Sequence, residues 1–168
     1  YPSWSPDGGK IAWFSDASGE YNLVVADQYG SNQKSYAIPN KKFYYYPVWS
    51  PNSKYIAFTD TDYNLWVMDL ATGTSKLVAT DKLAHPNRTM KPVWSPDSRW
   101  VAYAQIMENQ YKAIKIYSVE TGKSTQLTDG LSDAIDPQWD ENGKYLYFLA
   151  STDYALSTGW LDMGSYNY

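Results

Sequence analysis

The sequence predicts an all-β fold, a partial β-propeller built from about three and a half four-stranded blades. Three observations lead to it: a pattern that recurs every 45 residues, short apolar runs rich in β-branched and aromatic residues, and a proline inside every unit. A period of about 40 to 50 residues is typical of propeller blades and of some helical repeats. Recurrent proline interrupts helices and the composition of the apolar runs favours strands, so we reject the helical alternative.

The repeat is centred on a tryptophan that follows a proline by two positions and precedes a turn-forming segment. It occurs four times, as Trp4, Trp49, Trp94 and Trp139. A short apolar strand follows each of them in the same frame. We expect these rings to fill the wedge between neighbouring blades, so core packing is favoured over a role in ligand binding. Trp4 and Trp139 should be the more exposed pair, because they would border blades that this chain lacks.

One complete unit divides into four strands over residues 46–50, 54–60, 63–70 and 74–79, separated by polar turns. The corresponding blades are 1–45, 46–90, 91–135 and an incomplete fourth at 136–168. Residues 151–168 show no complete hairpin pattern. A closed propeller has about four to eight blades. We therefore expect one partial domain that is a fragment of a larger chain.

Composition excludes several classes of protein. The formal net charge of −4 argues against a nucleic-acid partner, because nucleic-acid-binding surfaces are usually basic. No apolar run is long enough to span a bilayer. The chain has no Cys, which excludes disulfides, thiolate metal sites and Cys nucleophiles.

Catalytic motifs are also missing from the sequence. A Ser-His-Asp triad needs a His as general base, and the chain has one, His85, in a loop-like stretch where a surface role is favoured. No Gly-x-Ser-x-Gly elbow is present to hold a nucleophile. Asn87 begins a glycosylation sequon, which matters only in a glycosylating secretory pathway. We assign no catalytic residue and no cofactor to this segment.

Two acidic stretches raise the question of a metal site. Residues 60–64 imitate the start of a calcium loop, but Leu65 and Ala71 stand where the EF-hand needs Gly and Glu, so a polar hairpin turn is favoured. Asp129, Asp133 and Asp136 lie close in sequence, where three carboxylates could hold a hard cation. A solvated acidic loop is the favoured interpretation, and no metal is expected.

The densest aromatic run, residues 43–46, has two interpretations. It lies near one mouth of the expected channel, where Tyr44 and Tyr45 could form a rim that contacts extended peptides. Alternatively, alternate rings of the run pack between the first two blades, which is the favoured interpretation.

The string Pro-x-Trp-Ser-Pro-Asp, followed by an Ile-Ala-Phe-like strand, resembles the WD40-like Pro-Asp repeat of TolB and tricorn-type propellers. Longer stretches are similar to the N-terminal propeller of large tricorn-type serine proteases: residues 13–21, 119–130, 148–153 and 158–163. In that family the propellers precede a PDZ-like module and a serine protease core, and they admit and channel peptide substrates. No protease core is recognisable in this sequence, so no catalytic residue is carried over.

The resemblance leaves two functional hypotheses. The first is a non-catalytic propeller segment of a tricorn-like serine protease that serves peptide-substrate access and domain assembly. Its partners would be further blades, a protease core and peptides or unfolded polypeptides. The second is a TolB-like protein-binding scaffold with no attached enzyme. The resemblance slightly favours a periplasmic or secreted location over a cytoplasmic one. Uncovered sheet faces at both ends would make the isolated segment prone to self-association, including homo-oligomers that close a ring.

Overall fold

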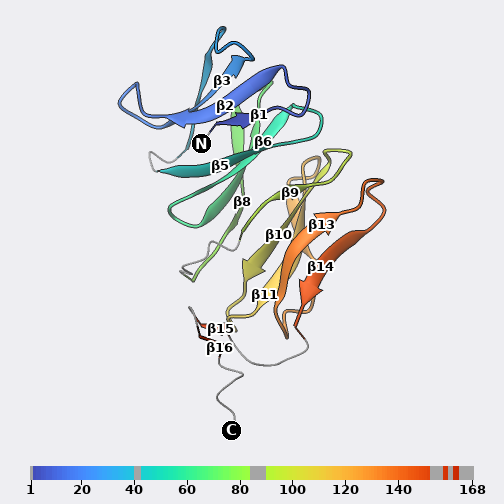
Figure 1. The fold of residues 1–168 in the computed structure, drawn as a ribbon. Helices are drawn as coiled ribbons and strands as arrows, with labels where there is room; N and C mark the ends of the chain where they lie inside the picture. Colours follow the sequence, from blue (N-terminus) through green and yellow to red (C-terminus); the bar gives the residue numbers. More distant parts are fainter. Residues whose placement is uncertain (1, 40–42, 84–89, 152–156, 159–160, 163–168) are drawn as a thin grey trace.

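The computed structural model describes residues 2–39, 43–83, 90–151, 157–158 and 161–162. These residues contain sixteen strands and no helix. Figure 1 shows the sheets of β1 to β14 following one another in chain order, each packed beside the next. The expectation of an all-β chain of propeller blades is confirmed.

Three four-stranded antiparallel sheets, blades 1 to 3, have their strands in sequence order. Blade 1 contains β1 (Ser3–Trp4), β2 (Lys10–Ser15), β3 (Asn22–Asp27) and β4 (Lys34–Ala37). Blade 2 contains β5 (Tyr44–Trp49), β6 (Tyr55–Asp60), β7 (Asn64–Asp69) and β8 (Thr74–Thr80). Blade 3 contains β9 (Val93–Trp94), β10 (Trp100–Ile106), β11 (Lys112–Ser118) and β12 (Lys123–Gln126).

Two smaller sheets follow. Strands β13 (Ala134–Trp139) and β14 (Leu146–Ala150) pair beside blade 3 and begin the fourth unit. Strands β15 (Ser157–Thr158) and β16 (Leu161–Asp162) form a short hairpin, a pairing that the sequence pattern does not indicate. No helix long and apolar enough to cross a membrane is found among the described residues.

Blade 2 is apolar on both faces because it has a neighbouring blade on both sides. In β6, Ile56 and Phe58 pack toward blade 1, whereas Ala57 between them packs toward blade 3. All three side chains are fully buried. Strand alternation therefore sends successive residues into two different cores, and neither face of the sheet needs polar residues.

The Ser-Pro-Asp segments close the turn between the first two strands of a blade. In blade 3, Ser95 Oγ donates to Asp97 Oδ1 at 2.6 Å and accepts from Trp100 N at 2.9 Å. Ser50 and Asn52 make the same contacts in blade 2. The third residue after the Ser adopts the left-handed conformation, with φ of 61° at Ser98. Side-chain bonds that close a turn explain why Ser and Asp or Asn recur at these positions.

The repeat tryptophans connect successive blades through their indole nitrogens. Trp49 Nε1 donates to the carbonyl oxygen of Ser3 at 3.0 Å, Trp94 Nε1 to that of Val48 at 3.1 Å, and Trp139 Nε1 to that of Val93 at 3.3 Å. Each acceptor lies on the first strand of the preceding blade, directly before that blade's own repeat Trp. The first strand lies at the edge of its sheet. The indole therefore donates to a carbonyl oxygen that has no partner on a neighbouring strand.

The burial of the four repeat tryptophans depends on whether a blade lies on each side of the ring. Trp49 and Trp94 lie between complete blades and are 6% and 7% exposed. Trp139 is half-buried, and Trp4 is 55% exposed. The indole of Trp4 makes no hydrogen bond within the described residues. Its ring lies on the side of blade 1 that no other described sheet covers.

The first strand of blade 2 begins two residues before position 46. Tyr44 and Tyr45 pair with Asp60 and Thr59, and a bulge then shifts the register before Val48. Within the bulge, Tyr46 has a φ of 42°. Strand β13 repeats the arrangement, with a bulge between Ile135 and Gln138 and a φ of 50° at Asp136. A bulge re-aims side chains locally, and here it exposes the residue before the repeat proline.

Candidate functional site

The candidate site lies at the end of the sheets where the second strand of each blade turns into the third. Because the strands are antiparallel, the chain also crosses from one blade to the next at this end. Residues 61–63 and 107–111 form the turns, and residues 81–83 and 127–133 belong to the connections. Two features lie here: an exposed group of aromatic rings at blades 1 and 2, and a pocket at blades 2 and 3.

The aromatic rim consists of Phe43, Tyr45, Tyr46 and, from blade 1, Tyr21. Ring centroids of Tyr21 and Phe43 are 5.3 Å apart, and those of Phe43 and Tyr45 are 5.0 Å apart, both edge to face. Phe43 is 48% exposed and Tyr46 is 60% exposed. An exposed row of rings offers apolar area together with phenolic hydroxyls, which suits contact with an extended polypeptide.

Tyr44, which one of the two sequence interpretations places at the rim, is buried in the core. Its ring is 3% exposed and packs between Phe14 and Phe58, with centroid distances of 5.3 and 5.5 Å. Strand alternation explains the difference, because adjacent residues of β5 point to opposite sides. Tyr45 is half-buried and contacts Phe43, so it belongs to the rim. Tyr44 thus agrees with the second interpretation of the aromatic run, in which every other ring packs between the first two blades.

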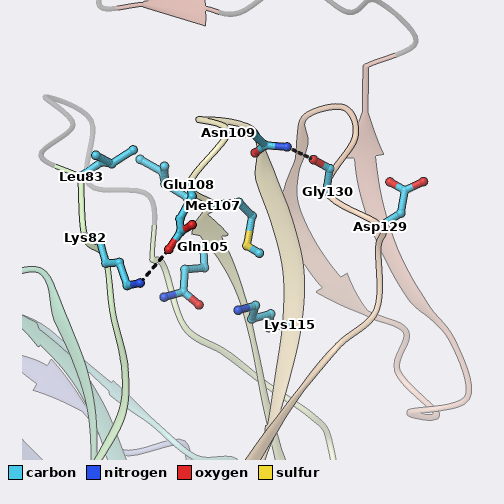
Figure 2. A pocket seen from close by; sticks show the side chains of 10 residues that line it. Lys82, Leu83, Gln105, Met107, Glu108, Asn109, Lys115, Asp129 and Gly130 are labelled. Carbon is cyan, nitrogen blue, oxygen red and sulfur yellow. Dashed lines mark hydrogen bonds and ion pairs between the residues drawn. The ribbon is translucent and has the colours of Figure 1, made fainter.

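The pocket has a volume of about 540 Å³. Its walls come from the connection after β8, from the end of β10 with its turn, from β11 and from the connection after β12. Leu83, Ile106 and Met107 supply its apolar surface, and Gln105 and Lys115 project from the face of blade 3 (Figure 2). This size lies within the range of small-ligand pockets, about 300–1,000 Å³.

Polar contacts fix the pocket walls. Asp81, which is 6% exposed, accepts from the main-chain nitrogen of Ile106 at 3.1 Å and so connects blade 2 to blade 3. Asn109 Nδ2 donates to the carbonyl oxygen of Gly130 at 2.8 Å (Figure 2). Lys82 Nζ lies 2.9 Å from Glu108 Oε1, and this hydrogen bond holds the pKa of Glu108 below its ordinary value. Asp81, Lys82, Glu108 and Asn109 therefore all have hydrogen-bond partners within the chain.

The calcium-like stretch is a polar hairpin turn. Asp60 is fully buried, and its carboxylate accepts from the main-chain nitrogen of Asn64 at 3.0 Å, from Asn64 Nδ2 at 2.9 Å and from Trp66 Nε1 at 2.9 Å. It also accepts from the main-chain nitrogen of Asp62 at 2.9 Å. These donors occupy both carboxylate oxygens, so the group acts as a cap for the turn.

The second acidic stretch does not gather its carboxylates. Asp129 Oδ1 accepts from the main-chain nitrogen of Leu131 at 3.0 Å, and Asp133 Oδ1 from that of Lys112 at 2.9 Å. Asp136 lies in the bulge of β13. In the part of the chain that the structure describes, no group of three His, Cys, Asp or Glu residues is placed to hold a metal ion. His85 and the sequon at Asn87 lie outside the described residues.

Comparison with known protein families shows which family this chain belongs to. Residues 1–157 match the family described as the tricorn protease second β-propeller domain. The chain belongs to this family. The tricorn-type assignment from the repeat motif is therefore confirmed, and the match is to the second propeller, whereas the sequence resemblance pointed to the N-terminal one.

Individual relatives place this tricorn-type propeller among longer proteins. A Bacillus subtilis protein called "Uncharacterized peptidase YuxL" is 26% identical over 152 residues, which is 89% of this chain and 21% of that protein. The crystal structure of the tricorn protease superposes with a TM-score of 0.74 at 20% identity, over 85% of this chain and 14% of that one. TolB from Acinetobacter baumannii superposes with a TM-score of 0.58 at 24% identity, over 85% and 36%. These two structures establish the fold, and this chain spans about a fifth of its peptidase relative.

Sequence reasoning did not find the pocket. Its residues come from four separate segments and form no motif, so the pairing of β10 with β11 and the packing of blade 2 on blade 3 are needed to bring them together. The one available signal was the length of the connection between blades 2 and 3, because variable loops on a constant frame often carry binding residues.

Proposed function

We propose that this tricorn-type propeller is a non-catalytic segment of a larger peptidase, and that its loop end admits and guides extended polypeptide substrates. The observation that carries the proposal is the presence of the exposed aromatic rim and the recessed pocket at the same end of adjacent blades. Family membership and the peptidase relative supply the context. The blades themselves serve domain assembly, because their faces are built to pack against further sheets.

The geometry suits binding rather than bond cleavage. The rim offers ring faces, and the pocket offers amide and ammonium groups beside apolar side chains. Stacked aromatic contacts contribute about 0.5–1.5 kcal/mol beyond the burial of their area and tolerate many partner sequences. A surface that guides varied substrates toward a separate active centre needs this kind of broad, sequence-tolerant contact.

The test uses the full parent protein and two peptide substrates, one long and unstructured and one short. Replacing Tyr46 by Ser should raise KM for the long peptide several-fold and leave KM for the short one unchanged, because only the long one reaches the rim. Tyr29 provides the matched control, since it is 84% exposed and lies in the turn between β3 and β4 at the opposite end of the sheet. Equal effects of Tyr46→Ser and Tyr29→Ser would contradict the proposal.

The second candidate, a TolB-like scaffold without an enzyme, is favoured by the superposition on two TolB structures. It predicts that the parent protein binds folded proteins and hydrolyses no peptide. The same assay measures the peptide hydrolysis. For location, the resemblance supports a periplasmic or secreted parent, and cell fractionation with an antibody against this segment tests it.

A further inference from the structure

The pocket contains a lysine, Lys115, for which the described residues supply no acidic partner. Lys115 is half-buried on β11 and lies directly across from Tyr103 on β10, so its side chain shares a face of the sheet with Gln105. Within the described residues, Lys115 Nζ takes part in no ion pair and no hydrogen bond. A half-buried ammonium group without a partner in the described chain provides a favourable position for an anion.

The two acidic residues that line the pocket do not meet that requirement. Glu108 is paired with Lys82. Asp129 accepts from the main chain of Leu131, and in Figure 2 its carboxylate is turned away from Lys115. An anion that binds Lys115 therefore comes from outside the described residues.

A hydrogen-bond acceptor and an apolar wall accompany the ammonium group. Gln105 Nε2 donates to the carbonyl oxygen of Thr80 at 2.9 Å, which fixes the amide and leaves Oε1 as its acceptor. Figure 2 shows the Gln105 amide between Lys82 and Lys115, with Met107 beside it. Leu83 and Met107 line the pocket and supply apolar surface. The matching ligand has one carboxylate, an N–H donor and an apolar group close together.

We propose that this pocket binds an acidic side chain within an extended peptide. The carboxylate of the peptide's Asp or Glu accepts from Lys115 Nζ, a peptide N–H donates to Gln105 Oε1, and a neighbouring apolar side chain packs on Leu83 and Met107. The chain carries a net charge of −4, so one isolated ammonium group selects a single carboxylate rather than a polyanion. The inference rests on the proposed function, since it names the residue type that the substrate presents here.

Fluorescence anisotropy with the full-length protein and a serine peptidase inhibitor tests the proposal. Three labelled peptides are compared, the first two with a C-terminal amide: one with an internal Glu between apolar residues, one with Gln in its place, and the Gln peptide with a free C-terminal carboxylate. A charge-assisted hydrogen bond predicts about tenfold tighter binding of the Glu peptide than of either Gln peptide. Lys115→Gln should abolish this preference and leave the affinity for the Gln peptides unchanged.

Lys123, exposed on β12 of the same blade, provides the matched control, and Lys123→Gln should keep the full preference. Equal affinity of the wild-type protein for the Glu and Gln peptides would overturn the inference, as would a preference that persists in Lys115→Gln. Tight binding of the free-carboxylate Gln peptide would also overturn it, because the site would then select a peptide C-terminus. If no peptide binds at all, the proposed function itself fails, which separates the two outcomes.

Discussion

Replacing Trp94 by Phe probes the indole bonds that join the blades. The Trp94 ring stacks on Tyr55 with centroids 5.9 Å apart, and its Nε1 donates to the Val48 carbonyl oxygen at 3.1 Å. Phe keeps much of the apolar contact but cannot donate. A lost hydrogen bond costs about 0.5–1.5 kcal/mol, and a buried acceptor left unsatisfied costs about 1–3 kcal/mol. We therefore expect the free energy of unfolding to fall by about 1–3 kcal/mol with Phe and by about 3–5 kcal/mol with Ala.

Urea unfolding followed by far-ultraviolet circular dichroism measures the change, at a protein concentration where light scattering shows a single species. The dependence of the unfolding free energy on urea should stay the same, so that the midpoint reports stability alone. Trp4→Phe is the control, since this exposed indole has no hydrogen bond in the described residues, and its effect should stay below about 0.5 kcal/mol. A Trp94→Phe variant as stable as Trp4→Phe would refute the reasoning.

Three further predictions concern acid stability, association and activity. Although desolvation raises the pKa of Asp97, hydrogen bonds from Ser95 and from the main-chain nitrogen of Arg99 lower it overall. The stability that Asp97 contributes is thus complete above its unfolded-state pKa of about 3.9 and is lost as pH falls through the lower folded-state value. Asp97→Asn, which keeps an acceptor as Asn52 does in blade 2, should therefore flatten the loss of stability below about pH 4 in urea titrations, and an unchanged acid slope would count against this. The isolated chain exposes Tyr147 and Leu149 of β14 by 62% and 64%, so we expect light scattering to detect self-association, whereas a monodisperse, cooperatively folding monomer would contradict this. Finally, the isolated chain should hydrolyse no peptide in a fluorogenic assay, and an activity lost on changing His85 would show this to be wrong.

The blade architecture was accessible from sequence because its causes are local. Turn chemistry at Ser-Pro-Asp and strand alternation act within a few residues, so the predicted strands 54–60 and 63–70 agree with β6 and β7 to within one residue at either end. The start of β5 was missed because a bulge has no strong local signal. The bulge places Tyr46 in the left-handed conformation, which tyrosine rarely adopts, so the sequence does not indicate it.

The candidate site was less accessible because its causes are non-local. The sequence identified the aromatic run, but only the register of β5 decides that Tyr44 is buried and Tyr45 lies at the rim. The partnerless state of Lys115 depends on where Glu108 and Asp129 point, and that depends on turns from different segments. Composition cannot distinguish a recessed lysine from a solvated one, whereas the packing of blade 2 against blade 3 does.

The direction of the tryptophan bonds bears on the order in which the blades can assemble. The donor always belongs to the later blade in the chain and the acceptor to the earlier one, as with Trp94 and Val48. During synthesis from the N-terminus, the acceptor strand is therefore complete before the tryptophan that needs it has been made. Each new blade therefore meets an acceptor carbonyl that has already been synthesised. Growth of the array is thus directional, and no blade after the first requires a downstream segment to satisfy its own indole.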